Sequence, residues 1–91
     1  MPSYLVETYL ARGRAEERAA REARARSAAA KLTRAGTRVR FDGVIHVPED
    51  ETCFFVFGAP SGEQAALVAE LAALDPVRVV EAVTSREEHE R

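Results

Sequence analysis

The stretch TRVRFDGVIHVPEDETCFFVFGA, residues 37–59, decides the fold of this chain. Its first part alternates in polarity and predicts a strand over Thr37–Val47, with one dry face. Turn residues follow at Pro48 to Glu51, and Thr52–Ala59 (TCFFVFGA) is apolar on both sides, as a central strand is. The stretch therefore predicts a β-hairpin at the centre of a sheet.

The rest of the chain extends this hairpin on both sides. Ser3–Leu10 and Val77–Thr84 are rich in β-branched and aromatic residues and are predicted as strands. Arg14–Ala35 is a long helix by propensity, and a second helix begins with a capping box at Ser61 and ends before Pro76. The order βαββαβ predicts an α+β, ferredoxin-like fold, in which an antiparallel four-stranded sheet carries two helices on one face.

Length and composition predict one small domain over residues 1–84, followed by a charged tail at residues 85–91. There is no apolar run that could span a bilayer and no secretory signal at Met1–Leu10, so we expect a cytoplasmic protein without a membrane partner. The single cysteine, Cys53, excludes an internal disulfide.

Charge is unevenly distributed along the chain. Residues 1–40 hold ten Lys/Arg and four Asp/Glu, whereas residues 41–91 hold three and eleven. Most of the basic residues lie in the predicted long helix, where Glu17–Arg21 and Glu22–Arg26 have the spacing of helical ion pairs, so a solvated helix face is favoured over a nucleic-acid footprint. RNA binding on the aromatic pair Phe55 and Phe57 is also disfavoured, because the third strand lacks the basic-Gly-aromatic lead of RNP1 and the pI is 5.7.

The face of the sheet opposite the helices is predicted to be mixed in character. A four-residue turn pairs Val47 with Thr52, Ile45 with Phe54 and Gly43 with Val56 on the core side. The same register leaves a set of apolar and charged side chains on the other side, namely Leu5, Tyr9, Phe55, Phe57, Val79, Val83, Glu7, Arg40, Asp42, His46 and Glu81. Such a face is too apolar to remain in water, which predicts a homodimer with a pocket between two sheets.

The candidate ligand-binding residues belong to this predicted face. They are Glu7, Tyr9, Arg40, Asp42, Phe55, Phe57 and Glu81. Glu7, Arg40 and Glu81 are expected to share one polar site, where two neighbouring carboxylates in an apolar pocket could perform acid–base chemistry. The alternative is that the carboxylates form salt bridges with Arg38, Arg40 or Arg78.

His46 and Cys53 are the candidate metal ligands. The predicted turn makes them direct cross-strand neighbours, with Cβ atoms about 4.5–5.5 Å apart. Imidazole and thiolate suit Ni²⁺ or another divalent transition metal, with carboxylates of the PEDE turn nearby. The alternative is a strand-end histidine beside a small buried hydrophobe.

Three segments carry a resemblance to a known family. YLVE (Tyr4 to Glu7), VPEDETCFFVFGAPS (Val47 to Ser61) and PVRVVEAV (Pro76 to Val83) resemble the small actinobacterial DUF4242 proteins, described as nickel-binding-protein-like. The resemblance implies a dimeric ferredoxin-like α+β barrel and suggests binding of a divalent metal such as nickel.

Two functions remain open at this point. The first is a small dimeric binding protein that holds a divalent metal ion or a small ligand between its sheets. The alternative is a cofactor-independent enzyme, of the isomerase, cyclase or monooxygenase type, which acts on a small hydrophobic or polyketide-like substrate by analogy of fold. Hydrolase and nucleotide-dependent classes have no residue-level support, because no Gly-rich phosphate loop, Ser/His/Asp set or spaced Cys/His cluster is present.

Overall fold

The secondary structure follows the predicted order of elements. The computed structural model describes residues 1–83 and 85, so the end of the last predicted strand at Thr84 and nearly all of the predicted tail at residues 85–91 lie outside the described residues. The elements are β1 (Ser3–Tyr9), the 3-10 helix η1 (Arg12–Glu17), α1 (Arg18–Arg34), β2 (Arg40–Val47), the 3-10 turn η2 (Pro48–Asp50), β3 (Thr52–Gly58), α2 (Gly62–Leu71) and β4 (Arg78–Ala82).

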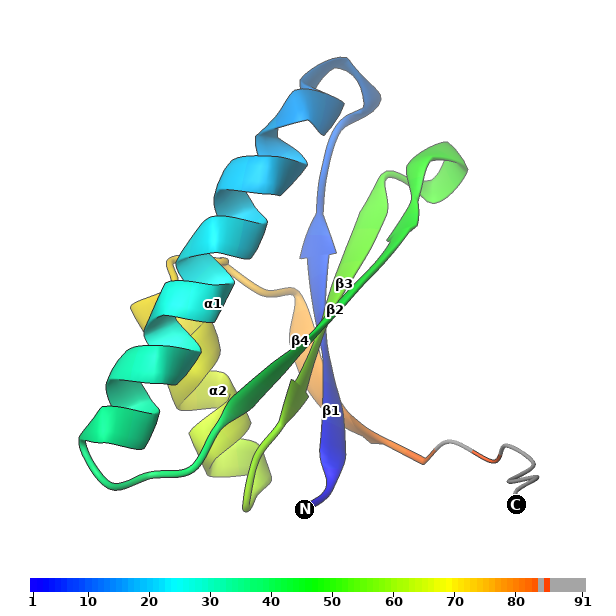
Figure 1. Cartoon of the computed structure of the whole chain (residues 1–91). Helices are drawn as coiled ribbons and strands as arrows, with labels where there is room; N and C mark the ends of the chain where they lie inside the picture. The colour runs from blue at the N-terminus through cyan, green and yellow to red at the C-terminus, as the bar shows by residue number, and fades with distance from the viewer. Residues whose placement is uncertain (84, 86–91) are drawn as a thin grey trace, which may run out of the picture.

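The four strands form one antiparallel sheet in the order β2-β3-β1-β4. Both helices lie on the same side of this sheet, and the other side carries no helix (Figure 1). The predicted α+β class, with a four-stranded antiparallel sheet and two helices on one face, is thus confirmed, and the arrangement is compatible with a ferredoxin-like fold. Neither α1 nor α2 is long and apolar enough to cross a membrane.

The predicted local signals for the helices are confirmed in part. Ser61 caps α2, because its hydroxyl accepts a hydrogen bond from the Gln64 amide at 3.4 Å. At the start of α1, Glu17 of η1 pairs with Arg21 at 3.3 Å as predicted. Glu22, however, pairs with Arg18 at 3.2 Å, one turn toward the N-terminus, and the predicted Glu22–Arg26 pair does not form.

The core lies between the helices and the sheet. Its helix side consists largely of small residues, which let the two helices approach the strands closely. These buried residues are Ala25, Ala28 and Ala29 of α1 and Ala65, Val68 and Ala69 of α2. The sheet side supplies the volume, because Phe55 and Phe57 are completely buried and the ring of Phe41 lies 5.4 Å from that of Phe57. Aromatic rings from the sheet therefore fill the space that alanine leaves open.

A β-bulge in β2 interrupts the predicted hairpin register. Pairing is as predicted from Val47 with Thr52 back to Gly43 with Val56. Beyond Gly43 one extra residue is accommodated, so Arg40 lies opposite Gly58, whereas the sequence analysis paired it with Ala59. Gly43 has a φ of 132°, a conformation that residues with a side chain rarely adopt.

The predicted assignment of faces on β3 is wrong. Cys53, Phe55 and Phe57 point toward the helices and are fully buried, whereas Phe54 and Val56 point away from them. Asp42 is the extra residue of the bulge and has no cross-strand partner, so the pairing with Phe57 that the predicted register implies does not form. The physical reason is the bulge in β2. Regular alternation would put Ile45 and Val47 on the same face as Phe41, and the hairpin register would extend that face to Phe54 and Val56 of β3. The extra residue instead puts Val44 on the face of Phe41, opposite the buried Phe55.

The C-terminal end of α2 contains an alanine in the left-handed conformation. Ala73 has a φ of 56°, and its amide donates to the Glu70 carbonyl at 3.0 Å while Leu74 donates to Ala69 at 3.0 Å. This is the helix-ending position that glycine normally occupies. We expect Ala73→Gly to raise the free energy of unfolding by about 0.5–1 kcal/mol, because the left-handed conformation strains alanine.

The matched control is the same substitution at Ala66, an exposed position inside α2. There, glycine should lower the free energy of unfolding by about 1 kcal/mol. Urea unfolding of both variants measures the difference, and a loss of stability in both would contradict the assigned conformation of Ala73.

Candidate functional site

The side of the sheet that carries no helix is the candidate site, and we call it the open face. Its residues alternate with the buried ones along each strand and occupy matching positions in the cross-strand register. They are Ser3, Leu5, Glu7 and Tyr9 of β1, Arg40, Gly43, Ile45 and Val47 of β2, Thr52, Phe54, Val56 and Gly58 of β3, and Arg78, Val80 and Ala82 of β4.

The centre of the open face is apolar. Leu5 on the central strand β1 lies between Val56 on one side and Val80 on the other. Toward the rim, Tyr9 and Ile45 are 60% and 51% exposed. A contiguous apolar surface of this kind on a small domain marks an interaction or ligand site.

One ion pair is set into this apolar surface. Glu7 lies between Phe54 and Arg78 in the register, and Arg78 Nε donates to Glu7 Oε1 at 2.7 Å. The Glu7 side chain is only 24% exposed, whereas that of Arg78 is 65% exposed. The alternative of a salt bridge to arginine is therefore confirmed for Glu7, and the ion pair holds its carboxylate in place next to Phe54 of the neighbouring strand.

A second ion pair lies near the start of β2. Arg40 is paired with Asp42 and lies across Gly58, where an added Cβ would come within 2.8 Å of Arg40 Nη2. Gly58 thus leaves room for the guanidinium to lie flat on the sheet. Because Gly58 faces Ser3, four residues before Glu7 on β1, Arg40 and Glu7 occupy separate places.

The predicted shared site of Glu7 and Glu81 is wrong. Glu81 lies opposite Tyr4, which is buried on the helix side, so the two carboxylates point to opposite faces of the sheet. Val79, also predicted on the open face, packs against the core. Glu81 was placed with Glu7 to avoid burying its charge, but β4 is an edge strand and Glu81 is exposed to solvent on the helix side. A pair of neighbouring carboxylates is therefore not available for acid–base chemistry.

His46 and Cys53 are direct cross-strand neighbours, as predicted. They lie on the helix side, however, next to the start of α1. Arg18 Nη1 is 3.2 Å from His46 Nδ1, and because a guanidinium can only donate, this nitrogen accepts the hydrogen bond. Cys53 is fully buried, and this burial raises the pKa of its thiol.

These two residues fit a divalent metal poorly. A transition metal needs the thiolate, which burial disfavours, and a free imidazole nitrogen, whereas Nδ1 of His46 already accepts from an arginine. Among residues 1–83 and 85, no group of three or more His, Cys, Asp or Glu side chains is arranged to hold an ion. The alternative of a strand-end histidine beside a small buried hydrophobe describes the observed environment better.

The chain was compared with known protein families, curated proteins and solved structures. No family model, no curated protein and no solved structure matches this chain. The resemblance to DUF4242 proteins therefore stays a prediction, and the site is interpreted from its own geometry.

Of the candidate ligand-binding residues, sequence reasoning placed Glu7, Tyr9 and Arg40 on the face where the structure has them. It missed Phe54, Val56 and Arg78, which the register brings together around Glu7. A signal for the error was present in the sequence, because an isolated glycine inside a strand pattern, here Gly43, suggests a bulge.

The buried thiol makes stability depend on pH. Since the pKa of Cys53 is raised in the folded state, the folded protein retains its proton longer than the unfolded chain does. The stabilisation is complete below the ordinary thiol pKa, about 8.5, and is lost as pH rises toward the raised value.

We expect the free energy of unfolding of wild type, relative to Cys53→Ala, to fall by at most about 1.4 kcal/mol for each pH unit above this point. Chemical denaturation at pH 7.5–9.5 measures the difference. Tyrosine and lysine titrate in both proteins, so their effect on stability cancels in the comparison with Cys53→Ala. A difference that stays constant with pH would show that Cys53 ionises as readily in the folded protein as in the unfolded chain.

Proposed function

We propose that this chain forms a homodimer through the open face, and that the space between the two facing sheets holds a small, largely apolar organic ligand. The observation that carries the proposal is the open face itself. It presents an apolar centre around Leu5 and one fixed, partly shielded carboxylate at Glu7. A second copy of the chain is the partner that matches this surface.

Self-association is supported by size and by symmetry. A chain of 91 residues that folds alone buries a smaller fraction of its surface than a larger domain does. A two-fold contact brings the same patch of each copy together, so the apolar centre of one open face meets that of the other. We expect the contact to bury more than roughly 1,000 Å² in total, the size of a specific interface.

A ligand space between the sheets is supported by the unequal size of the side chains on the open face. Gly43 occupies an open-face position of β2 with open space where a side chain would stand, whereas Phe54 and Tyr9 project from the open face. Two such faces do not fill the interface evenly. A mostly apolar lining with a few fixed polar groups is typical of small-molecule sites, and Glu7 with Arg78 supplies the polar pair here.

The choice of an organic ligand over a metal follows from the donors present. His46 and Cys53 lie away from the open face and are poor metal ligands as arranged. The cofactor-independent enzyme has no residue-level support beyond Glu7, because its proposed partner Glu81 lies on the other face. Binding is therefore the function that the observed geometry supports best.

Adjacent phenylalanines on β3 provide a matched test of the dimer. Phe54 belongs to the open face and Phe55 to the core. We expect Phe54→Glu to shift the protein from dimer to monomer in sedimentation at micromolar concentration, with a cooperative unfolding transition retained.

Phe55→Ala should instead cost about 3–5 kcal/mol of stability, because it opens a cavity in the core. Wild-type protein that sediments as a monomer at high micromolar concentration would contradict the proposed dimer, as would a Phe54→Glu variant that remains dimeric.

The ligand is tested by native mass spectrometry of the purified protein together with elemental analysis. We expect a dimer that retains an organic molecule and carries no stoichiometric nickel. Glu7→Gln should lower the affinity for the retained molecule about tenfold or more without changing the dimer mass, since a hydrogen bond to a charged group contributes about 1.5–3 kcal/mol. Stoichiometric metal without an organic adduct would overturn this part of the proposal.

A further inference from the structure

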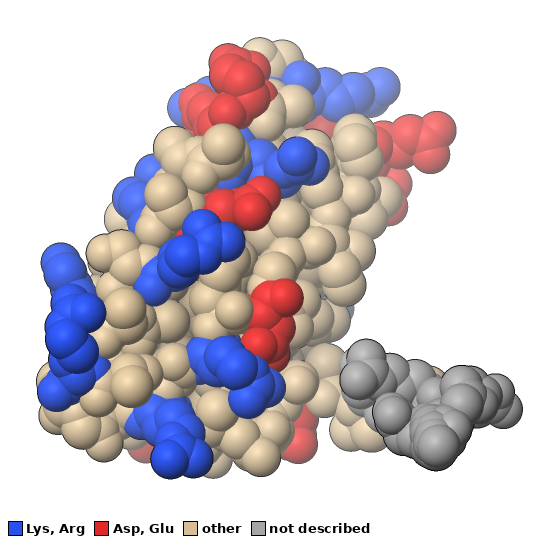
Figure 2. Space-filling model, in the orientation of Figure 1, with Lys and Arg blue, Asp and Glu red and all other residues tan. Residues whose placement is uncertain are grey.

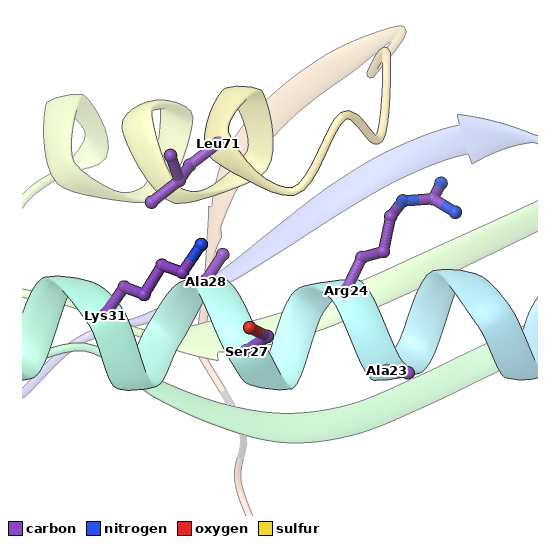
Figure 3. Close-up of a pocket in the computed structure, with 6 residues that line it drawn as sticks. All are labelled: Ala23, Arg24, Ser27, Ala28, Lys31 and Leu71. Carbon is purple, nitrogen blue, oxygen red and sulfur yellow. The ribbon is translucent and has the colours of Figure 1, made fainter.

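A groove lies between the two helices, on the side of the molecule opposite the open face. It has a volume of about 320 Å³ and is lined by Ala23, Arg24, Ser27, Ala28, Lys31 and Leu71 (Figure 3). Five of these residues come from α1, and Leu71 projects from α2 toward them. This volume is at the lower end of the range that small-molecule sites occupy.

The groove exists because α1 presents small side chains to α2. Ala23, Ser27 and Ala28 do not reach across the gap, and Leu71 remains 49% exposed although it lies at the helix–helix junction. A packed interface between helices would fill this space with larger side chains. The groove therefore has an apolar wall that is left partly open to solvent.

The charge of the groove has one sign. Arg24 and Lys31 line it, and no acidic side chain does. Arg24 Nε donates to the Ala72 carbonyl at 2.9 Å, which holds the guanidinium against the end of α2 and offsets the negative end of that helix. Lys31 takes part in none of the ion pairs found between described residues.

The surroundings reinforce this positive field. From Ala23 to Val39 the chain contains five Lys/Arg and no Asp/Glu. Three earlier arginines, Arg14, Arg18 and Arg21, are paired with Glu17 or Glu22, and Arg40 is paired with Asp42. Figure 2 shows the Lys and Arg side chains gathered over α1. An anion near the groove meets a region of unbalanced positive charge.

The geometry points to a binding site for a small amphiphilic anion in this groove, and we propose that it accepts a carboxylate or phosphate group attached to a short apolar chain. The anionic group lies between Lys31 and the Ser27 hydroxyl, one helical turn apart on α1. The apolar chain covers Leu71. This site is separate from the open face and does not depend on the proposed dimer.

The test is an NMR titration of the ¹⁵N-labelled full chain with octanoate, octyl phosphate and neutral 1-octanol. We expect octanoate or octyl phosphate to shift the amides of Ser27, Lys31 and Leu71, and to bind more tightly than octanol. The stronger of the two anions identifies whether the carboxylate or the phosphate is preferred.

Three variants make the test specific. Lys31→Gln should weaken anion binding about fivefold, the contribution of one exposed ion pair. Arg34→Gln removes a neighbouring charge of α1 that does not line the groove and should leave the affinity within about twofold of wild type. Ser27→Leu fills the groove and should abolish binding without changing any charge.

Equal affinity of wild type and Lys31→Gln would overturn the proposal, and so would octanol binding as tightly as the anions. Shifts confined to Leu5, Phe54 and Val80 would also overturn it, because they would place the anion on the open face. That last result would leave the proposed dimeric binding function standing, so the two proposals fail independently.

Discussion

Phe55 and Phe57 pack beneath helices whose contacting residues are mostly alanine, and the rest of the structure depends on this contact. The small helix side chains permit a close approach, and the rings supply the volume that a domain of this size needs. Because side chains of a strand alternate between faces, burying these two rings turns Phe54 and Val56 outward. The same packing that stabilises the core therefore creates the apolar open face.

The order of the strands and α-helices could be predicted because each has a local cause, whereas their ends shifted and the 3-10 helix η1 ahead of α1 was not predicted. Polarity alternation, the PEDE turn, the Ser61 cap and the alanine-rich stretch all act over a few residues. The hairpin pairs from Val47–Thr52 to Gly43–Val56 follow from the length of the turn alone. Such signals can be recognised in the sequence because they do not depend on tertiary packing.

The faces could not be predicted in the same way, because they depend on a single residue. Regular alternation puts Phe41 and Ile45 on one side, but the bulge at Gly43 separates them, so Phe41 packs on the core and Ile45 points outward. On β4, Glu81 was assigned by the cost of burying a charge, which does not apply at a solvent-exposed edge. The predicted faces were therefore right for Glu7, Tyr9 and Arg40 and wrong for Phe55, Phe57 and Glu81.

The bulge has a further consequence for how the protein avoids aggregation. The outer edge of β2 is the longer of the two free sheet edges, and an uninterrupted edge would offer its backbone groups to any other strand. The irregularity at Asp42 and Gly43 disrupts that template, and β4, the other edge, is only five residues long. Growth of the sheet by addition of strands is thereby hindered at both ends, which protects the chain from open-ended, amyloid-like polymerisation at high concentration.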